Sequence, residues 1–420
     1  MDIFVYIDAG NLSHKPLFMG VLRSESVRGK EVFSFRPDDE WVRSKPFSFL
    51  DADLKQFALE QYVPESKPNF GVFMDSCPDR WGRVLMQRRE RIRATAAQRP
   101  VRRLSESDYL LGVYDGNRMG ALRFKTDKNG PFLDNDNQLA TPPMTSMNLL
   151  EQASLNYEKD NSEKSSDFNT WLRMLYAPGS SLGGARPKAN VMGSDGSLWI
   201  AKFPSHNDHT DVGAWEYVVN MMAKEFGLRV PECRAQRFSS RFHTFLTRRF
   251  DRGENGIRLH FASAMTLLGY TDGSDASDGS SYLEMAEMLR RYGTCRQKEE
   301  LLELWKRVVF NIAISNCDDH LRNHGFILTN KGWNLSPAFD LNPDPQGLGL
   351  KLNISETDNS LDFELALSTA QFYGLTPKDA TDQISLLKRI VSSWRAKATR
   401  LGISRREQEE MSPAFASAFV

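Results

Sequence analysis

The chain has 420 residues, with 54 lysines and arginines against 54 aspartates and glutamates, so its formal net charge is zero. Such a chain lacks the global positive field that draws proteins to bare nucleic acid or anionic membranes, although it can carry local patches. Hydrophobic residues make up 40% of the chain and aromatic residues 11%, which excludes disorder for its bulk. The length suggests two or three domains.

The cysteines and the first residues indicate a reduced, cytoplasmic protein with no membrane contact. The four cysteines are far apart and form no Cys-x-x-Cys pair, so neither a zinc cluster nor a disulfide framework is expected. The start, MDIFVYIDAG, lacks the basic residues and long apolar core of a signal peptide. No run of about 18 apolar residues is present to span a membrane.

The first part of the chain predicts a mixture of strands and helices. DIFVYID and EVFSFRP have the composition of strands, and residues 69–93 predict an apolar stretch that leads into a helix with Asp79 as N-cap. Residues 109–124 hold two apolar runs on either side of an Asp-Gly turn. After Phe124 the composition shifts to Asn, Asp, Pro and Gly, which marks the best domain boundary.

A second mixed region follows this boundary. Residues 145–176 predict a helix interrupted by a polar stretch, and residues 179–205 predict a glycine-rich loop and two strands around a Ser-Asp-Gly turn. Residues 212–228 have helical spacing with Gly227 as C-cap, and HTFLTRRFDR alternates as a strand does. From Tyr282 onward helices are expected in SYLEMAEMLRRYG, KEELLELWKRVVFNIAISN and DQISLLKRIVSSWRAKATRLG.

The charges are unevenly distributed along the chain. Between Arg80 and Arg103 there are nine arginines and a single acid, Glu90, whereas residues 271–287 contain no base. The arginine-rich stretch is either a solvated helix face with its following loop or a docking patch for an acidic partner or nucleic acid.

The strongest constellation of polar residues lies in NCDDHLRNHGFILTNKGWNLSPAFDLNP, residues 316–343. Asp318 is followed five residues later by Asn323, then by an apolar hairpin and by Asp340 at its far end. Phosphoryl transfer needs one carboxylate for the attacking hydroxyl, and a second carboxylate with an amide oxygen for Mg²⁺. Protein kinases use the same Asp-x4-Asn spacing and place the metal-binding Asp after a hairpin. The alternative is a polar turn with helix caps beside a hairpin.

A kinase also needs a phosphate cradle and a lysine. In GSSLGGARPK, Gly179, Gly183 and Gly184 allow close backbone approach to phosphate, although the stretch is neither a P-loop nor Gly-x-Gly-x-x-Gly. The alternative is an ordinary surface turn. Lys202 follows in an apolar strand, where a lysine needs an anionic partner. Glu216 lies 14 residues further on and is either the partner of Lys202 or an exposed helical glutamate.

Two further sites are suggested by position in the chain. HTFLTRRFDR fits the strand that leads into the linker between kinase lobes, where adenine binds, and alternation makes Arg248 and Phe250 candidates. The alternative is a plain edge strand. His320 and His324 have a spacing that suits zinc on a helix, but no second ligand cluster is present, so zinc is disfavoured.

In this order, SSLGGARPKA, AKFP, WEYVVNMMAKEFGLRVPE, RRFDR, DDHLRNHGF and PAFD resemble the HipA family of bacterial serine/threonine kinases, usually the toxins of toxin–antitoxin pairs. The resemblance covers the whole chain, since PDRWGR and YLLGVYDGNRMGALRF are similar to the family's N-terminal subdomain. The most specific motif, Asp-x-His-x-Lys/Arg-Asn, is matched by Asp318, His320, Arg322 and Asn323. Arg322 stands where many members have lysine, so a fork of donors replaces a point charge.

The resemblance implies ATP and Mg²⁺ as cofactors and assigns roles by position. Asp318 would be the catalytic base, and Asn323 and Asp340 would bind Mg²⁺. The ATP-binding residues would be Gly183, Gly184, Ala185, Arg186, Lys188, Lys202, Arg248, Arg249, Phe250, His320, Arg322 and Asn323.

The resemblance also implies a switch in the glycine-rich loop. Family members autophosphorylate a serine at the start of this loop, which ejects the loop and silences the kinase. Ser181 matches that position, and Ser180 is adjacent. A phosphoserine dianion would lose the backbone cradle for which it competes, so the switch is physically sensible.

We therefore expect an α+β protein with four parts. Residues 1–125 would form a mixed α/β N-terminal subdomain and residues 126–165 a linker. Residues 166–255 would form the N-lobe of a kinase-like domain with the glycine-rich loop, and residues 256–420 a mainly helical C-lobe with the catalytic loop.

The expected activity is transfer of the ATP γ-phosphate to a protein serine or threonine. The resemblance suggests an aminoacyl-tRNA synthetase as substrate, with inhibited translation and growth arrest as the outcome. It also suggests a HipB-like helix-turn-helix antitoxin as partner, and DNA contact only through that partner. The alternatives are a small-molecule kinase of similar fold and a non-catalytic binding module that regulates a DNA-binding antitoxin. The intact Asp318, Asn323, Asp340 and Lys202 argue against the binding module.

Overall fold

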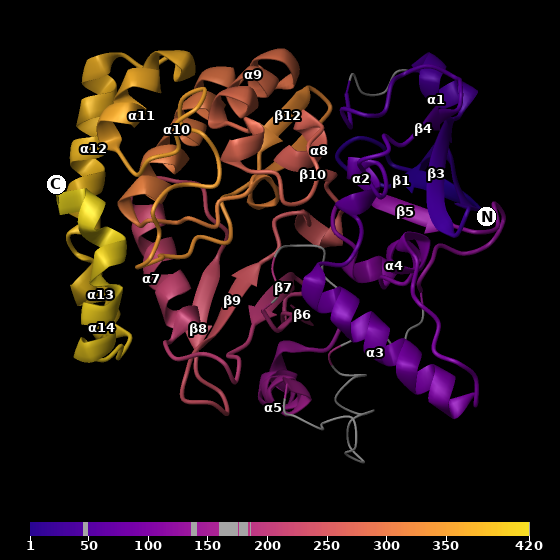
Figure 1. Cartoon of the computed structure of the whole chain (residues 1–420), viewed down its shortest axis with the longest axis horizontal. Helices are drawn as coiled ribbons and strands as arrows, with labels where there is room; N and C mark the ends of the chain where they lie inside the picture. Colours follow the sequence, from indigo (N-terminus) through magenta and orange to yellow (C-terminus); the bar gives the residue numbers. More distant parts are fainter. Residues whose placement is uncertain (45–48, 136–140, 159–174, 176–183, 185, 420) are drawn as a thin grey trace. The chain divides into compact units, whose positions relative to one another are not determined.

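The structure is a computed structural model, and it describes the chain apart from residues 45–48, 136–140, 159–174, 176–183, 185 and 420. Its helices and strands are labelled in Figure 1. The chain divides into two compact units. The first comprises Met1–Asp208 and Arg237–Ala262, and the second comprises His209–Gln236 and Ser263–Val420.

An antiparallel sheet with the strand order β4-β3-β2-β1-β5 forms the amino-terminal part of the first unit (Figure 1). Ile3, Val5 and Ile7 are buried along β1 and alternate with more exposed residues, as expected for a strand with one face in the core. The strands are β1 (Asp2–Ile7), β2 (Leu17–Val27), β3 (Lys30–Pro37), β4 (Gln61–Tyr62) and β5 (Leu122–Lys125).

The short helix α2 (Gly71–Met74) packs on this sheet through aromatic contacts. The ring of Phe73 lies 5.6 Å from that of Phe35 in β3 and 6.1 Å from that of Phe124 in β5. Such pairs add to the stability gained from buried apolar area.

Asp51 ties a loop to the start of α2. Its carboxylate accepts hydrogen bonds from the backbone N–H groups of Asp53 and Val72, both at 2.8 Å. Asp51 is fully buried, and burial raises the pKa of its carboxyl to about 7. The loop and the helix are therefore joined by a carboxyl group that carries a proton more readily than usual.

Residues 109–124 differ from their predicted pattern. The first apolar run belongs to helix α4 (Glu106–Leu111), which starts with a capping box between Ser105 and Asp108. The Asp-Gly turn lies in the 3-10 turn η1 (Asp115–Asn117), and only the second run forms a strand, β5. The capping box explains why the first run is helical, because it satisfies the N-terminal N–H groups of α4.

The first unit contains a second antiparallel arrangement of strands, β6, β7 and β9, on which two helices pack. Trp81 of α3 and Tyr157 of α5 share a core with Ala189 of β6 and Trp199 of β7. The Trp81 indole N–H also donates to the carbonyl of Lys188 at 3.0 Å. The elements are α3 (Arg80–Ala96), α5 (Met147–Glu158), β6 (Lys188–Met192), β7 (Leu198–Lys202) and β9 (Thr244–Arg248).

The predicted start of α3 is confirmed. Asp79 is its N-cap, and the carboxylate accepts a hydrogen bond from Gly82 N at 2.8 Å. The remaining short elements of this unit are α1 (Asp39–Ser44), η3 (Met144–Ser146) and η5 (Glu254–Gly256), and β10 (Phe261–Ser263) lies where the chain passes to the second unit.

The second unit is mainly helical. α10 (Gln297–Ala313) contacts α9, α11 and α12, and its tryptophan and phenylalanine side chains are fully buried. The predicted hairpin after Asn323 is confirmed as β11 (Gly325–Thr329) and β12 (Gly332–Leu335). The other elements are α7 (Val212–Glu225), β8 (Cys233–Gln236), α8 (Ala264–Leu268), η6 (Ala276–Asp278), α9 (Tyr282–Tyr292), η7 (Leu321–Asn323), α11 (Phe363–Thr369), η8 (Ala370–Tyr373), α12 (Pro377–Val391), α13 (Trp394–Arg400), α14 (Arg405–Met411) and η9 (Ser412–Phe419).

The last predicted helix is divided into α12 and α13. Ser392 and Ser393 lie at the break, and their hydroxyls donate to the carbonyls of Arg389 and Ile390 at 2.7 Å. Serine side chains compete for helical carbonyls in this way and often bend or end a helix. Among the described residues, no helix is long and apolar enough to cross a membrane.

Candidate active site

The loop between α10 and β11 is held in shape by Asn323. Its side-chain amide donates to the carbonyl of Asp318 at 2.8 Å, and its backbone N–H donates to the carbonyl of His320 at 2.8 Å. These two bonds close the Asp-x4-Asn segment into one compact turn. Asp318 stands at the surface of this turn, where a substrate can reach its carboxylate.

Only the nitrogen of the Asn323 side-chain amide has a hydrogen-bond partner among the described residues. Asn323 is 7% exposed, and its side-chain oxygen Oδ1 has no hydrogen-bond partner among the described residues. A buried carbonyl oxygen without a donor is costly, so such an atom points to an absent cation or donor.

Asp340 has an unusual backbone conformation. Its φ is +58°, in the left-handed region that non-glycine residues rarely adopt. Its carboxylate Oδ1 accepts a hydrogen bond from Asn342 Nδ2 at 3.4 Å, and the Oδ1 of Asn342 has no partner among the described residues. Carboxylate and amide oxygens are the donors that Mg²⁺ prefers, so this set fits that ion.

The groups around Asp318 tune its carboxyl. Neighbouring groups that displace water raise its pKa; His320, at 3.9 Å, lowers it, and the carboxylate of Asp340 raises it again. A raised pKa makes the carboxylate a better proton acceptor.

A cluster of buried polar residues packs against the loop of residues 318–323. Asp319 accepts a hydrogen bond from Lys351 N at 2.7 Å and another from the hydroxyl of Tyr282, which in turn accepts from Asn311 at 2.9 Å. The ring of Tyr282 meets His324 edge-on at 5.2 Å. Burial raises the pKa of Asp319 to about 7 and lowers that of His324 to about 3. The adjacent pair Asp318-Asp319 was the only sequence signal for this cluster.

Arg322 contacts the acidic segment that the sequence singled out. Its guanidinium lies 3.2 Å from the exposed carboxylate of Asp272. The contact joins the loop of residues 318–323 to residues 271–287, which contain no base.

The glycine-rich segment and Lys202 lie in the first unit. Gly184 has φ +84°, a conformation that other residues rarely adopt. Lys188 and Lys202 are directly opposite in the β6–β7 pairing, an arrangement that repels unless anions are near. Ser180, Ser181, Gly179, Gly183 and Ala185 lie outside the described residues.

Two of the basic residues in this region are paired with acids of the first unit. Lys188 Nζ lies 2.8 Å from Asp79, with both side chains about 3% exposed, and Arg186 binds Asp208 with two hydrogen bonds. Lys202 is less buried, and its ammonium lies 5.6 Å from the ring centre of Phe245. The sequence identified Asp79 as a helix cap, but it gave no signal for its lysine partner.

Arg248, Arg249 and Phe250 have different surroundings at the end of β9. Arg248 is exposed and Phe250 is half-buried against Phe261. Arg249 is buried, donates to both carboxylate oxygens of Asp251 at 2.8 and 2.7 Å, and donates to the carbonyl of Asn117 at 2.7 Å. Burial alone would raise the pKa of Asp251, but the guanidinium groups beside it hold that pKa well below its usual range.

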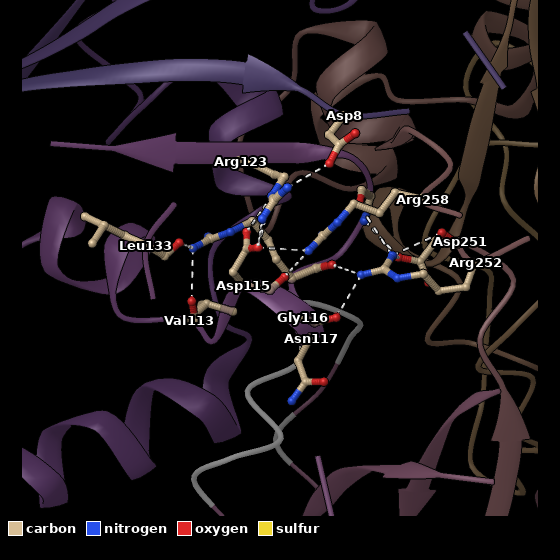
Figure 2. Close-up of polar contacts among 12 residues, drawn as sticks. Asp8, Val113, Asp115, Gly116, Asn117, Arg123, Leu133, Asp251, Arg252 and Arg258 are labelled. Carbon is tan, nitrogen blue, oxygen red and sulfur yellow. Dashed lines mark hydrogen bonds and ion pairs between the residues drawn. The ribbon is translucent and has the colours of Figure 1, made fainter. Parts of the chain in front are cut away.

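Figure 2 shows how this network continues into the amino-terminal sheet. Arg252 donates to Asp251 at 2.5 Å and to the carbonyl of Gly116 at 3.1 Å. Asp115 is contacted by Arg123 at 2.6 Å and by Arg258 at 3.2 Å. The segment after β9 is therefore fastened to residues around η1 by several charge-assisted hydrogen bonds.

Glu216 lies in the second unit, on α7. It is 2% exposed, and its carbonyl accepts a hydrogen bond from Asn220 at 2.8 Å. Lys202 belongs to the first unit, so the expected pairing of the two side chains stays a prediction.

The part of the chain that contains the loop of residues 318–323 and the hairpin after it matches a known family. A model of the HipA-like C-terminal domain matches residues 180–399, which is more than half of the chain. The chain belongs to the HipA family. The serine/threonine-protein kinase toxin HipA of Shewanella oneidensis is 25% identical over 193 residues, which are 39% of this chain and 43% of that protein. The match thus spans less than half the length of that curated HipA.

The HipA fold extends beyond the matched domain. A chain from the Shewanella oneidensis MR-1 complex of HipA, HipB and operator DNA has a TM-score of 0.66 and 16% identity. The likeness covers 99% of this chain and 95% of that chain. The predicted α+β fold of the HipA type is therefore confirmed.

Proposed function

We propose that the chain is an ATP- and Mg²⁺-dependent serine/threonine protein kinase that acts as a HipA toxin. One observation carries the proposal. Asn323 closes the catalytic loop onto Asp318 and leaves its buried Oδ1 free of any described partner, and such an oxygen suits a bound cation. Family membership supports the same reading, because a relative is named a serine/threonine-protein kinase toxin.

In the proposed reaction the acceptor hydroxyl oxygen forms a bond to the γ-phosphorus of ATP. The bond from that phosphorus to the β,γ-bridging oxygen breaks, and ADP leaves with the electron pair. The hydroxyl proton passes to the carboxylate of Asp318, whose raised pKa suits it as acceptor. Positioning and charge neutralisation supply most of the rate in such reactions.

The remaining residues are assigned by their chemistry. Mg²⁺, when bound, neutralises phosphate charge, and Asn323 and Asp340 would hold it. His320 and Arg322 would contact ATP beside them. The phosphates would be held by Gly183, Gly184, Ala185, Arg186, Lys188 and Lys202, and the adenine by Arg248, Arg249 and Phe250.

The finer assignments follow from the family. The protein substrate would be an aminoacyl-tRNA synthetase, the inhibitory autophosphorylation would fall on Ser181 or Ser180, and the partner would be a HipB-like antitoxin in the cytoplasm. The last assignment is supported by a HipA structure whose complex contains HipB and operator DNA. The division into four parts, with boundaries at residues 125, 165 and 255, belongs to the same proposal.

Transfer of labelled phosphate from ATP tests the central claim. Asp318→Ala should reduce incorporation into protein by about a hundredfold or more, the size of a general-base contribution. Asp382→Ala, which removes an exposed carboxylate from α12, is the matched control and should retain wild-type incorporation. Equal incorporation by wild type and Asp318→Ala would contradict the mechanism.

A further inference from the structure

The second unit contains a cavity of about 1000 Å³ beside Asp318. Its walls come from the catalytic loop, from η6 and from the segment that follows Asp340. Lining residues that bear on its chemistry are Asp275, Asn316, Asp344, Leu348 and Lys351. An acceptor hydroxyl must approach Asp318, so the cavity is a natural place for the rest of the acceptor.

The cavity wall is negatively charged. Asp275, Asp318 and Asp344 face a single cation, Lys351, in the lining. Hydrogen bonds from Ser277 lower the pKa of Asp275, so this carboxyl stays ionised at neutral pH. An occupant with positive charge would therefore be favoured over one with negative charge.

A second, independent observation points to an occupant that donates hydrogen bonds. Asn316 lines the cavity, is only 2% exposed, and its Oδ1 has no partner among the described residues. An N–H group of an occupant would supply the donor that this oxygen lacks.

Leu348 adds an apolar contact at the same place. Its side chain is 94% exposed although it lies in the cavity lining. A leucine held in full contact with water gains free energy when another apolar group covers it.

We propose that this cavity receives the protein segment that carries the acceptor hydroxyl, and that it selects a segment with lysine or arginine near that hydroxyl. The carboxylates of Asp344 and Asp275 and the free oxygen of Asn316 would bind the basic side chain, and Leu348 would cover an apolar neighbour. This inference rests on the proposed kinase function and names the class of its substrate.

Two synthetic peptides test the selection. Both have one serine in an alanine- and leucine-containing decapeptide, and they differ only in two flanking arginines or two flanking glutamates. Wild-type protein with ATP and Mg²⁺ should phosphorylate the arginine peptide with a kcat/KM at least about fivefold higher, as expected for a pair of favourable charge contacts. Asp344→Lys should lower that ratio to about one or invert it. Glu356→Lys, an equal charge change that does not line the cavity, should leave the ratio unchanged.

The outcomes separate the two claims. Equal kcat/KM for the two peptides with Asp318-dependent transfer would overturn the selection alone. If no acceptor is phosphorylated in an Asp318-dependent way, the proposed kinase function itself is wrong. Asp275→Lys is a second variant if Asp344→Lys does not fold. If the Asp344 variant shifts the Mg²⁺ requirement and not the peptide ratio, the cavity binds a metal and the selection is wrong.

Discussion

At the scale of single residues, the nitrogen and the oxygen of the Asn323 side-chain amide have different roles. Its nitrogen side fixes the loop by donating to the carbonyl of Asp318, and its oxygen side is left for a ligand. In the proposed kinase, the same amide would couple the position of the Asp318 carboxylate to the binding of Mg²⁺. Replacement by a residue with neither group should affect both.

The variant Asn323→Ala tests this coupling. The Mg²⁺ concentration for half-maximal phosphate transfer should rise at least about tenfold, because an oxygen donor is lost, as metal sites lose affinity when their surroundings are altered. Asn323→Asp keeps an oxygen acceptor and should need less additional Mg²⁺ than Asn323→Ala. The measurement is initial rate against Mg²⁺ at fixed ATP. An unchanged half-maximal concentration in Asn323→Ala would leave Asn323 a structural role only.

At the scale of elements, the end of β9 depends on one buried arginine. Arg249 is surrounded by Asp251, Asn117 and Asn190, whereas the adjacent Arg248 is exposed. Removing one partner of a buried ion pair leaves the other charge uncompensated. The two neighbouring arginines therefore form a natural pair of variants.

Arg249→Met should lower the free energy of unfolding by about 3–5 kcal/mol, whereas Arg248→Met should change it by about 1 kcal/mol or less. Urea unfolding followed by tryptophan fluorescence measures both. The double variant Arg249→Met/Asp251→Leu should regain part of the loss, because both buried charges are then absent. Similar losses for the two single variants would show that the network does not stabilise this unit.

The buried carboxyl of Asp51, which binds the start of α2, should make the free energy of unfolding depend on pH. The pKa of Asp51 is about 7 in the folded chain and near its ordinary value of 3.8 when unfolded, so between these values the folded chain binds a proton that the unfolded chain has released. Stability from this group is therefore full below about pH 4 and is lost as pH rises toward 7.

Asp51→Asn removes this titration. Urea midpoints at intervals from pH 4.5 to 7.5 should show the variant gaining stability relative to wild type as pH rises, by a total on the order of a few kcal/mol. Asp382→Asn, an exposed carboxylate of α12, should follow the wild type at every pH. Parallel curves for Asp51→Asn and wild type would mean that Asp51 does not titrate in this range.

At the scale of the whole molecule, part of the arginine-rich stretch is neutralised within the chain. Arg83 pairs with Glu106, Arg99 with Glu90 and Arg102 with Asp108, all at about 2.7 Å or less. The excess charge on α3 and its following loop is therefore smaller than the sequence alone indicates.

The sequence predicted those structural features that depend mainly on residues close together in the chain. The N-cap Asp79, the β11–β12 hairpin and helix α7 each have a local signal, and each is confirmed. The division between α12 and α13 was not predicted. It arises where two serine hydroxyls bind helical carbonyls, and the spacing of apolar residues gives no signal of such bonds.

For the candidate site, too, the sequence indicated residues that lie close together in the chain but not the contacts between distant residues. Asp318, Asn323 and Asp340 share one short segment, so their order along the chain was enough to propose them as a site. The partners Tyr282 of Asp319 and Asp79 of Lys188 are distant in sequence, and only tertiary packing brings each pair together. Spacing carries no information on contacts of this kind.

The pairing of Asp79 with Lys188 has a consequence for how such genes can recombine. The HipA-like C-terminal model starts at residue 180, but Lys188 and Trp199 lie against Asp79 and Trp81, far before that point. In a chimera joined near residue 180, Lys188 and β6 would come from one parent protein, whereas Asp79 and α3 would come from the other. Hybrids between diverged relatives should therefore survive only when α3 and β6 are inherited as one block.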